Sequence, residues 1–263
     1  MSMYNSHIDD LIHEIIEDFY KEYKITYQKH TNISLKLARY FNVRLKFIEI
    51  RPRKVHVSKE FIKDIFVSEY KDDILLLLEK IKRGIDVNPN QSKKSFNADY
   101  HDMLFNDWNI HHLHLNHNKK RPRDYFNIRT GPLLFIKFDL NNAYVLDVKH
   151  HHDQNVWSDT DIIRIIRNNW NYLLEPYEVG DGNWFPNLDD EGMGNLRNKG
   201  YIYPVNVDNK TYMLLGHGYA TSGDNMTANR LADDVHRWVG KNLEFFKSDK
   251  ENFKKELLEK MYL

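Results

Sequence analysis

The sequence of 263 residues contains no cysteine, and this absence excludes several kinds of chemistry. Without thiols the chain cannot form disulfides, thiolate zinc sites, iron–sulfur clusters or a cysteine nucleophile. Long hydrophobic runs are also missing: the longest, Ile74 to Leu78, falls far short of the ~20 residues of a membrane helix. The N-terminal residues lack the basic and apolar segments of a signal peptide. We therefore expect a cytoplasmic protein that has no membrane partner.

The sequence also lacks an excess of one charge, because 38 lysines and arginines balance 38 aspartates and glutamates. This balance argues against a polybasic protein whose whole surface binds nucleic acid, but it is compatible with a local basic patch. Apolar residues make up 41% of the chain, which argues against global disorder. A chain of this length and composition can bury a sizeable core.

The first third of the chain has the pattern of helices. Apolar positions recur every three or four residues over 7–29, and a shorter helix is predicted over 34–41. Ser58 is a good N-cap for a helix that runs to about Arg83, where Gly84 ends it. Residues 86–99 are polar and unpatterned, so they predict a loop or a domain boundary.

After this loop the periodicity changes to that of strands. Three strands are predicted first, at 109–115, 133–140 and 143–149. A helix to about residue 174, a loop over 176–195, a hairpin over 201–215 and two final helices complete the pattern. Short turns between successive strands mean antiparallel pairing.

The predicted fold class is therefore α+β: a helical N-terminal part followed by an antiparallel sheet flanked by helices. We expect residues 1–85 to form a helical N-terminal region and residues 100–263 to form an α+β domain that carries the histidines. One continuous domain is the alternative.

Histidine is concentrated in one region, since eight of the fourteen lie between His101 and His152. Six of these eight form two groups, His111 to His114 and His150 to His152. Histidine has an unperturbed pKa of ~6.5 and is the commonest metal ligand. Alternate residues of a strand share a face, so His112 and His114 should point the same way. By the same rule His150 and His152 should share a face with Tyr144, Leu146 and Val148, and we expect the two groups to meet if strand 109–115 pairs with the hairpin.

A basic segment with interleaved aromatic residues separates the two histidine groups. Its members are Lys119, Lys120, Arg121, Arg123, Tyr125, Phe126 and Arg129. Fixed cations beside imidazoles suit a phosphodiester substrate, because imidazoles can move protons and cations can stabilise charge on phosphoryl oxygens. The first hypothesis is a nuclease-type phosphodiesterase, most concretely an endoribonuclease of toxin or defence type; the toxin assignment is an analogy at fold level.

In this hypothesis His112 and His114 are acid–base candidates, with His150 or His152 as the partner. Arg123 and Lys120 contact phosphate, while Lys119, Arg121, Tyr125 and Arg129 bind the RNA. No cofactor is required. An inhibitor protein or a second copy of the chain is a further candidate partner.

Two alternatives remain open. A metal-dependent hydrolase would hold zinc or manganese with His112, His114, His150, His152 and Asp139, although their spacing matches no known zinc signature. A non-catalytic interaction protein would instead use its N-terminal helices. The glycine-containing run from Gly216 to Asp224 is predicted to be an ordinary turn and helix cap rather than a phosphate cradle.

Overall fold

The structure is a computed structural model that describes residues 3–65, 68–150, 160–182 and 184–262. The chain forms two compact units. A helical unit contains Met1–Phe47, Lys94–His101 and Ser222–Leu263, and an α+β unit contains Ile48–Lys93 and Asp102–Thr221. These units group the residues differently from the expected 1–85 and 100–263, because helices from both ends of the chain share one core.

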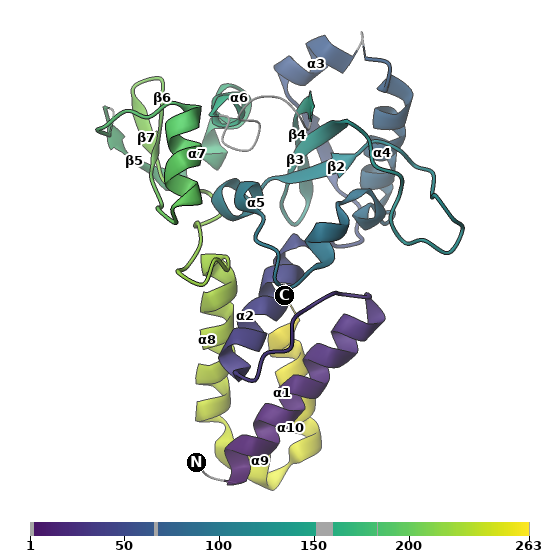
Figure 1. Cartoon of the computed structure of the whole chain (residues 1–263), viewed down its shortest axis with the longest axis vertical. Coiled ribbons are helices and arrows are strands. Elements are labelled where there is room, and N and C mark those ends of the chain that lie inside the picture. The colour runs from purple at the N-terminus through teal and green to yellow at the C-terminus, as the bar shows by residue number, and fades with distance from the viewer. Residues whose placement is uncertain (1–2, 66–67, 151–159, 183, 263) are drawn as a thin grey trace. The chain divides into compact units, whose positions relative to one another are not determined.

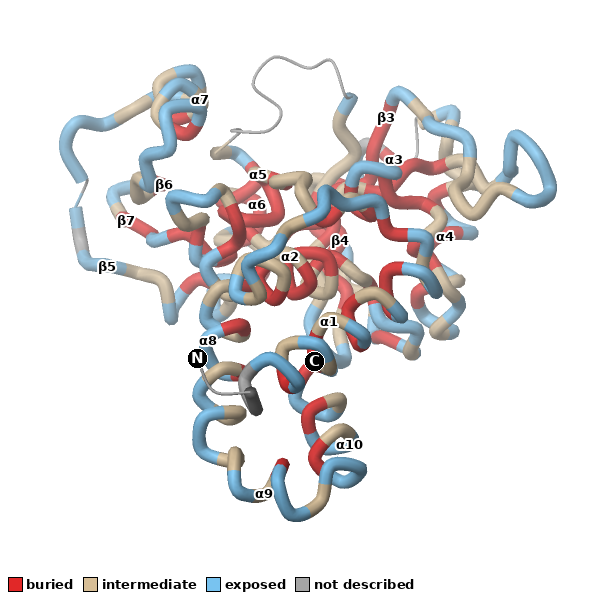
Figure 2. The backbone as a smooth tube through the Cα atoms, turned by 60° about the horizontal axis from the view of Figure 1, so that its bottom comes forward, coloured by how far each residue is buried: buried red, intermediate tan, exposed pale blue. Residues whose placement is uncertain are grey.

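The described residues of the helical unit form five α-helices. They are α1 (Met3–Glu22), α2 (Ile33–Lys46), α8 (Met226–Lys241), α9 (Leu243–Ser248) and α10 (Lys250–Met261). Buried positions recur along one side of α10, as Figure 2 shows, and they are Phe253, Leu257 and Met261. The Tyr40 hydroxyl of α2 donates to the carbonyl oxygen of Met261 at 3.0 Å. The second helix of the chain is thus joined to the last one.

The α+β unit contains two sheets with short helices (Figure 1). Its strands are β1 (Lys54–Val57), β2 (His111–His114), β3 (Pro132–Phe138), β4 (Asn142–His150), β5 (Glu178–Asp181), β6 (Val205–Val207) and β7 (Lys210–Tyr212). Its helices are α3 (Lys59–Ile65), α4 (Lys71–Arg83), α5 (Met103–Trp108), α6 (Asp161–Trp170) and α7 (Asp190–Asn198), with 3-10 turns at Asn88–Asn90, Asn171–Leu173 and Glu175–Tyr177. A further 3-10 turn, Lys93–Phe96, lies where the chain passes from this unit to the helical unit. The α+β fold class is confirmed.

The larger sheet has the strand order β1-β4-β3-β2. Strands β2, β3 and β4 are antiparallel, as predicted, and the expected pairing of the 109–115 strand with the hairpin is confirmed. Strand β1 is parallel to β4, so the sheet is mixed. Parallel pairing needs a long crossover, which is why the turn signals of the sequence did not reveal it.

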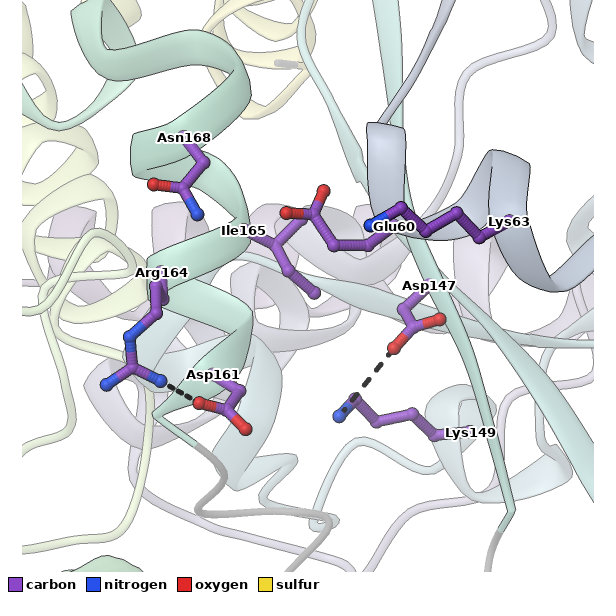
Figure 3. A pocket seen from close by; sticks show the side chains of 8 residues that line it. All are labelled: Glu60, Lys63, Asp147, Lys149, Asp161, Arg164, Ile165 and Asn168. Carbon is purple, nitrogen blue, oxygen red and sulfur yellow. Dashed lines mark hydrogen bonds and ion pairs between the residues drawn. The ribbon is translucent and has the colours of Figure 1, made fainter.

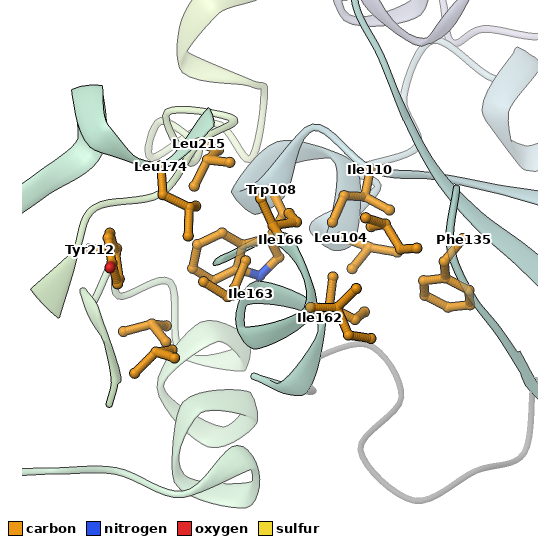
Figure 4. Close-up of a cluster of buried hydrophobic side chains, with 14 of the residues drawn as sticks. Leu104, Trp108, Ile110, Phe135, Ile162, Ile163, Ile166, Leu174, Tyr212 and Leu215 are labelled. Atoms are coloured by element: carbon orange, nitrogen blue, oxygen red, sulfur yellow. The ribbon is translucent and has the colours of Figure 1, made fainter. Parts of the chain in front are cut away.

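Apolar side chains cover both faces of this sheet. One cluster packs Leu133, Phe135, Tyr144 and Leu146 against α5, α6 and the smaller sheet (Figure 4). We call this side the α6 face. The other cluster packs Leu113, Leu134, Ile136, Ala143 and Val145 against α3 and α4. We call this side the α4 face.

Two local expectations need correction. The single helix predicted from Ser58 to Arg83 is two helices, since α3 ends at Ile65 and α4 begins at Lys71. Gly84 ends α4 as predicted, with φ 68°. Residues 176–195, predicted to be loop, contain β5 and the start of α7. Strand β5 exists because it pairs with β7, whose residues lie 29 to 34 positions further along the chain, and local composition does not reveal such a partner.

Candidate functional site

The register of the larger sheet places polar side chains in two rows across the α6 face. His112 is opposite Phe135, which is opposite Asp147; His114 is opposite Leu133, which is opposite Lys149. Residues paired across neighbouring strands share a face. The imidazoles of β2 therefore share their face with a carboxylate and an ammonium group at the other edge of the hairpin.

A β-bulge in β4 causes this arrangement. Ile136 pairs with Val145, but the next pair is Phe135 with Asp147, so Leu146 is the extra residue. A bulge of this kind reverses the side-chain alternation beyond it. Val148 consequently packs against the cluster of the α4 face, whereas Tyr144 and Leu146 belong to the cluster of the α6 face. The expectation that His150 shares a face with Tyr144, Leu146 and Val148 is wrong for this reason.

His112 and His114 are enclosed in the protein. His114 is 4% exposed, and its Nδ1 accepts a hydrogen bond from the backbone N–H of Thr130 at 3.1 Å. The His112 side chain is 11% exposed, with Nδ1 3.8 Å from Oδ2 of Asp102, the residue that N-caps α5. Imidazoles in these positions fix local structure, and solvent has little access to them.

The other predicted ligands lie apart from this pair. His150 is exposed at the end of β4, and its pairing with Pro132 puts it on the α4 face, opposite to His112 and His114. His152 lies outside the described residues. Asp139 follows the far end of β3, six residues and roughly 20 Å along the strand from the partner of His114. The structure thus does not gather the expected set.

At that far end, Asp139 accepts the hydrogen bonds that hold the turn between β3 and β4. It accepts hydrogen bonds from the backbone N–H groups of Asn141 and Asn142, at 2.8 and 2.7 Å, and from the Asn142 side chain. Although burial opposes it, this hydrogen bonding holds the pKa of Asp139 below its usual value. The carboxylate fixes the hairpin turn between β3 and β4.

A cavity of about 420 Å³ opens at the β4 edge instead. Strand β1 pairs with β4 only as far as Val145, so beyond that point the described part of β4 is paired on the β3 side alone. Helices α3 and α6 flank this unpaired edge, and Figure 3 shows the side chains that line the cavity. They are Glu60, Lys63, Asp147, Lys149, Asp161, Arg164, Ile165 and Asn168. We call this cavity the β4-edge pocket.

Two polar residues hold the walls of the β4-edge pocket. The Ser58 hydroxyl donates to the carbonyl oxygen of Leu146 at 2.6 Å and accepts from the backbone N–H of Phe61 at 2.9 Å. The predicted N-cap is thereby confirmed and is joined to the bulge. Asn169 of α6 accepts from the backbone N–H of Lys59 at 3.0 Å and donates to Oε2 of Glu60 at 2.7 Å. Glu60 is therefore oriented from two helices.

The pocket combines three carboxylates with three cations. Lys149 Nζ lies 3.8 Å from Asp147 Oδ2, and Arg164 pairs with Asp161. Lys63 is exposed and has no hydrogen bond or ion pair with any other described residue. A site of this composition can accept a proton at a carboxylate and neutralise an anion at an ammonium group.

Lys137 is a further charged side chain on the α6 face, opposite Tyr144. Burial lowers its pKa to about 8, and Asp139 only partly opposes the shift. Among the described residues it has no hydrogen-bond or ion-pair partner. It does not line the β4-edge pocket.

The predicted basic segment is a loop between β2 and β3 (Figure 1). Hydrogen bonds to residues 86–92 hold this loop in place. The Tyr125 hydroxyl donates to Asp86 at 3.0 Å, Asn127 donates to Asn90 at 3.2 Å, and Arg129 donates to Ser92 at 2.8 Å. The tyrosine and this arginine are therefore engaged in holding the loop. The loop enters β3 beside the end of β4, where a Cβ on Gly131 would lie 4.0 Å from His150 Nδ1.

The remaining cations of the loop are exposed. Arg121 pairs with Asp124, and hydrogen bonds from Arg121 hold the pKa of that carboxyl below its usual value. Lys120 and Arg123 have no ionic partner within the described residues. Lys119 is also exposed. These three cations form a surface that can contact phosphates.

No family model, curated protein or solved structure matches this chain. In the described part of the sequence, no group of three or more His, Asp or Glu side chains is placed to hold a metal ion. No described helix has both the length and the apolar composition that crossing a membrane requires.

Sequence reasoning concentrated on the histidines and missed the pocket residues Glu60, Lys63, Asp147, Lys149 and Arg164. The alternation of Asp147 and Lys149 immediately before His150 was a usable signal, because both had to share a face. Glu60 gave no signal, since only the tertiary structure brings α3 to the edge of β4.

Proposed function

We propose that the chain is a nuclease-type phosphodiesterase, an endoribonuclease, whose catalytic groups line the β4-edge pocket. The observation that supports this most directly is the pocket itself, where an oriented carboxylate and two ammonium groups meet near the sheet end that carries the basic loop. His112 and His114 lose the acid–base role in this proposal because they are enclosed. RNA is the substrate, and the cytoplasm, a reducing compartment, suits a protein without cysteine.

Each pocket residue has a role that follows from its chemistry. Glu60 keeps Oε2 on Asn169, while its Oε1 has no hydrogen bond to any other described residue, so Oε1 can take the proton of an RNA 2′-hydroxyl. The 2′-oxygen then forms a bond to phosphorus while the bond to the 5′-oxygen breaks. Lys63 and Lys149 stabilise the charge on the phosphoryl oxygens, and Lys149 returns a proton to the leaving 5′-oxygen.

The basic loop supplies affinity for the substrate. Phosphate contacts from exposed lysines and arginines give sequence-independent binding that weakens with salt. Lys119, Lys120 and Arg123 are the loop residues assigned to this contact. His150, exposed beside the loop, is kept as a residue that contacts substrate. Because Arg129 and Tyr125 hold the loop, they support binding indirectly.

The decisive experiment is a cleavage assay with a fluorescent RNA and untagged protein. Glu60→Gln keeps the size and the acceptor oxygen of the side chain but removes the base, so the rate should fall by about 10² to 10⁴. Glu49→Gln, which alters an exposed carboxylate paired with Arg51, should retain the wild-type rate. Wild-type protein that cleaves no RNA with or without added divalent ions would refute the proposal.

The same assay separates the proposal from a metal-dependent hydrolase. Activity that survives a chelator supports the side-chain mechanism. Activity that disappears with the chelator and returns with zinc or manganese would instead show that catalysis depends on a metal ion. RNA binding without cleavage would instead identify a binding protein.

A further inference from the structure

A polar network in the helical unit connects three stretches of chain that are far apart in sequence. It contains His30, Arg39, Asp99, His101, Ser222 and Asp224. We call this network the clasp. Arg39 lies on α2, while His101 and Ser222 are the residues of this unit where the chain leaves for the α+β unit and returns from it. Within the helical unit, the clasp therefore joins these two residues to α2.

Arg39 is the centre of the clasp. Its Nη1 lies 3.0 Å from Oδ1 of Asp224 and 3.0 Å from Nε2 of His101. The contact with Asp224 is an ion pair, and the contact with His101 is a hydrogen bond in which Arg39 is the donor. Asp224 is fully buried, and its Oδ2 also accepts from the Ser222 hydroxyl at 2.9 Å.

The second carboxylate holds the opposite side of the guanidinium group. Asp99 Oδ1 is 3.6 Å from Arg39 Nε and 2.8 Å from His30 Nε2. Its Oδ2 accepts from the backbone N–H of Gln28 at 2.6 Å. The loop before α2 is thus attached to the same network.

This geometry sets the protonation state of His101. A guanidinium group only donates hydrogen bonds, so the contact with Arg39 requires a lone pair on His101 Nε2. A protonated ring would direct an N–H at a cation and lose the contact. Gly223 leaves room for the ring, because a Cβ there would lie 2.9 Å from Nε2.

The charges around His101 are opposed. Burial and Arg39, followed by the more distant Lys46, lower the pKa of His101. Asp224, whose Oδ1 is 4.0 Å from Nδ1, and Asp99 raise it. These groups come from α2, from the 94–101 segment and from the turn before α8, and the net direction is downward.

We propose that His101 is the pH-sensitive element of the clasp: neutral His101 holds the turn Ser222–Asp224 against α2, and protonated His101 releases it. The stability of the folded chain should therefore depend on pH. Since the pKa of His101 is lower in the folded chain than the ~6.5 of an unfolded one, its contribution to stability is complete above pH 6.5. That contribution is lost as the pH falls from 6.5 toward the folded value.

The first test is an NMR titration of the histidine Cε1–H signals in the full chain, with the His101 signal assigned by its loss in His101→Gln. We expect the midpoint of His101 to lie below pH 6.5. A midpoint at or above 6.5 overturns the proposal. The midpoint is measured on wild-type protein, and the variant serves only to assign the signal. The result therefore does not depend on how well the variant folds.

The second test measures urea denaturation at pH 7.5 and pH 5.5. His101→Gln offers Arg39 an amide oxygen at both pH values, so the midpoint of the variant should change less between them than that of the wild type. His236→Gln is the matched control, because His236 contacts the Ser34 hydroxyl at 2.9 Å rather than a cation. It should keep the wild-type pH dependence. Equal dependence in wild type and His101→Gln would contradict the proposal.

Discussion

The two edges of the larger sheet carry similar polar side chains on the same face, yet their environments differ. At the β2 edge, His112 and His114 are enclosed with α5, and their nitrogens are directed at Asp102 and at the backbone of Thr130. At the β4 edge, Asp147 and Lys149 line an open cavity. The difference arises because β1 stops pairing at Val145 and leaves the remainder of β4 uncovered on that side.

This comparison shows that residue type is a weaker guide to function than whether neighbouring elements pack over the residue and bury it. An imidazole beneath a helix stabilises the fold, and a lysine at an unpaired edge can meet a substrate. Substitutions at the two edges should therefore have opposite consequences: lost activity at β4 and lost stability at β2.

The largest expected effect is on catalysis at the β4 edge. Lys149→Met removes one of the cations that line the cavity and the proposed proton donor, so RNA cleavage should fall at least about 10²-fold. The urea midpoint should change less than the cleavage rate, because methionine keeps the apolar stem of the side chain and the ion pair with Asp147 is long, at 3.8 Å. Rate and midpoint are measured on the same preparation. Unchanged cleavage would mean that the pocket has no role in the reaction.

The next largest effect is on stability at the β2 edge. His114→Ala should lower the free energy of unfolding by about 2 to 4 kcal/mol, because it leaves a cavity and an unsatisfied backbone N–H at Thr130. His150→Ala, at an exposed position, should change it by less than about 0.5 kcal/mol. If His114→Ala keeps full stability but loses RNA cleavage, the imidazole is catalytic and the comparison fails.

Lys137 provides an intermediate case, since it lies on the same face but does not line the pocket, and it has no ionic or hydrogen-bond partner among the described residues. A shift of its pKa from 10.5 to about 8 corresponds to at most about 3 kcal/mol. Lys137→Met should raise stability at pH 7 by up to that amount. Wild-type stability should rise as the pH increases from about 8 toward 10.5, because the unfolded chain binds the proton more tightly there. Denaturation at pH 7 and pH 9.5 checks both statements, and a wild type without this rise would contradict them.

The smallest expected effect is at the basic loop. Replacing Lys120 and Arg123 with glutamine should weaken RNA binding modestly. It should also reduce the slope of log affinity against log salt by about 1.4, since each lost contact to a single strand contributes about 0.7. Lys54→Gln, an exposed lysine of β1, is the control and should leave the slope unchanged. Equal slopes for all three proteins would remove the loop from the proposed substrate surface.

Much of the secondary structure followed from local pattern. The N-cap at Ser58 and the end of α4 at Gly84 were predicted correctly, because cap preferences depend on a few neighbouring residues. The hairpin of β6 and β7 was predicted for the same reason, and Asp208 and Asn209 occupy its turn with positive φ. Long-range pairs such as β1 with β4 had no local signal.

The candidate site was much harder to predict. Strict alternation placed His150 with Leu146 and Val148, but one extra residue in β4 reversed the faces and brought Asp147 and Lys149 to the cavity. A bulge depends on how a strand fits its neighbour, so alternation within one strand does not reveal it.

By itself, the sequence determined the α+β class, the antiparallel three-strand core and the positions of the caps, since these depend on periodicity and on short-range hydrogen bonds. Only the tertiary structure decided which polar side chains are enclosed, which line a cavity, and that helices from both chain ends share one core. Burial is a property of what packs over a residue, and that covering comes from segments remote in sequence.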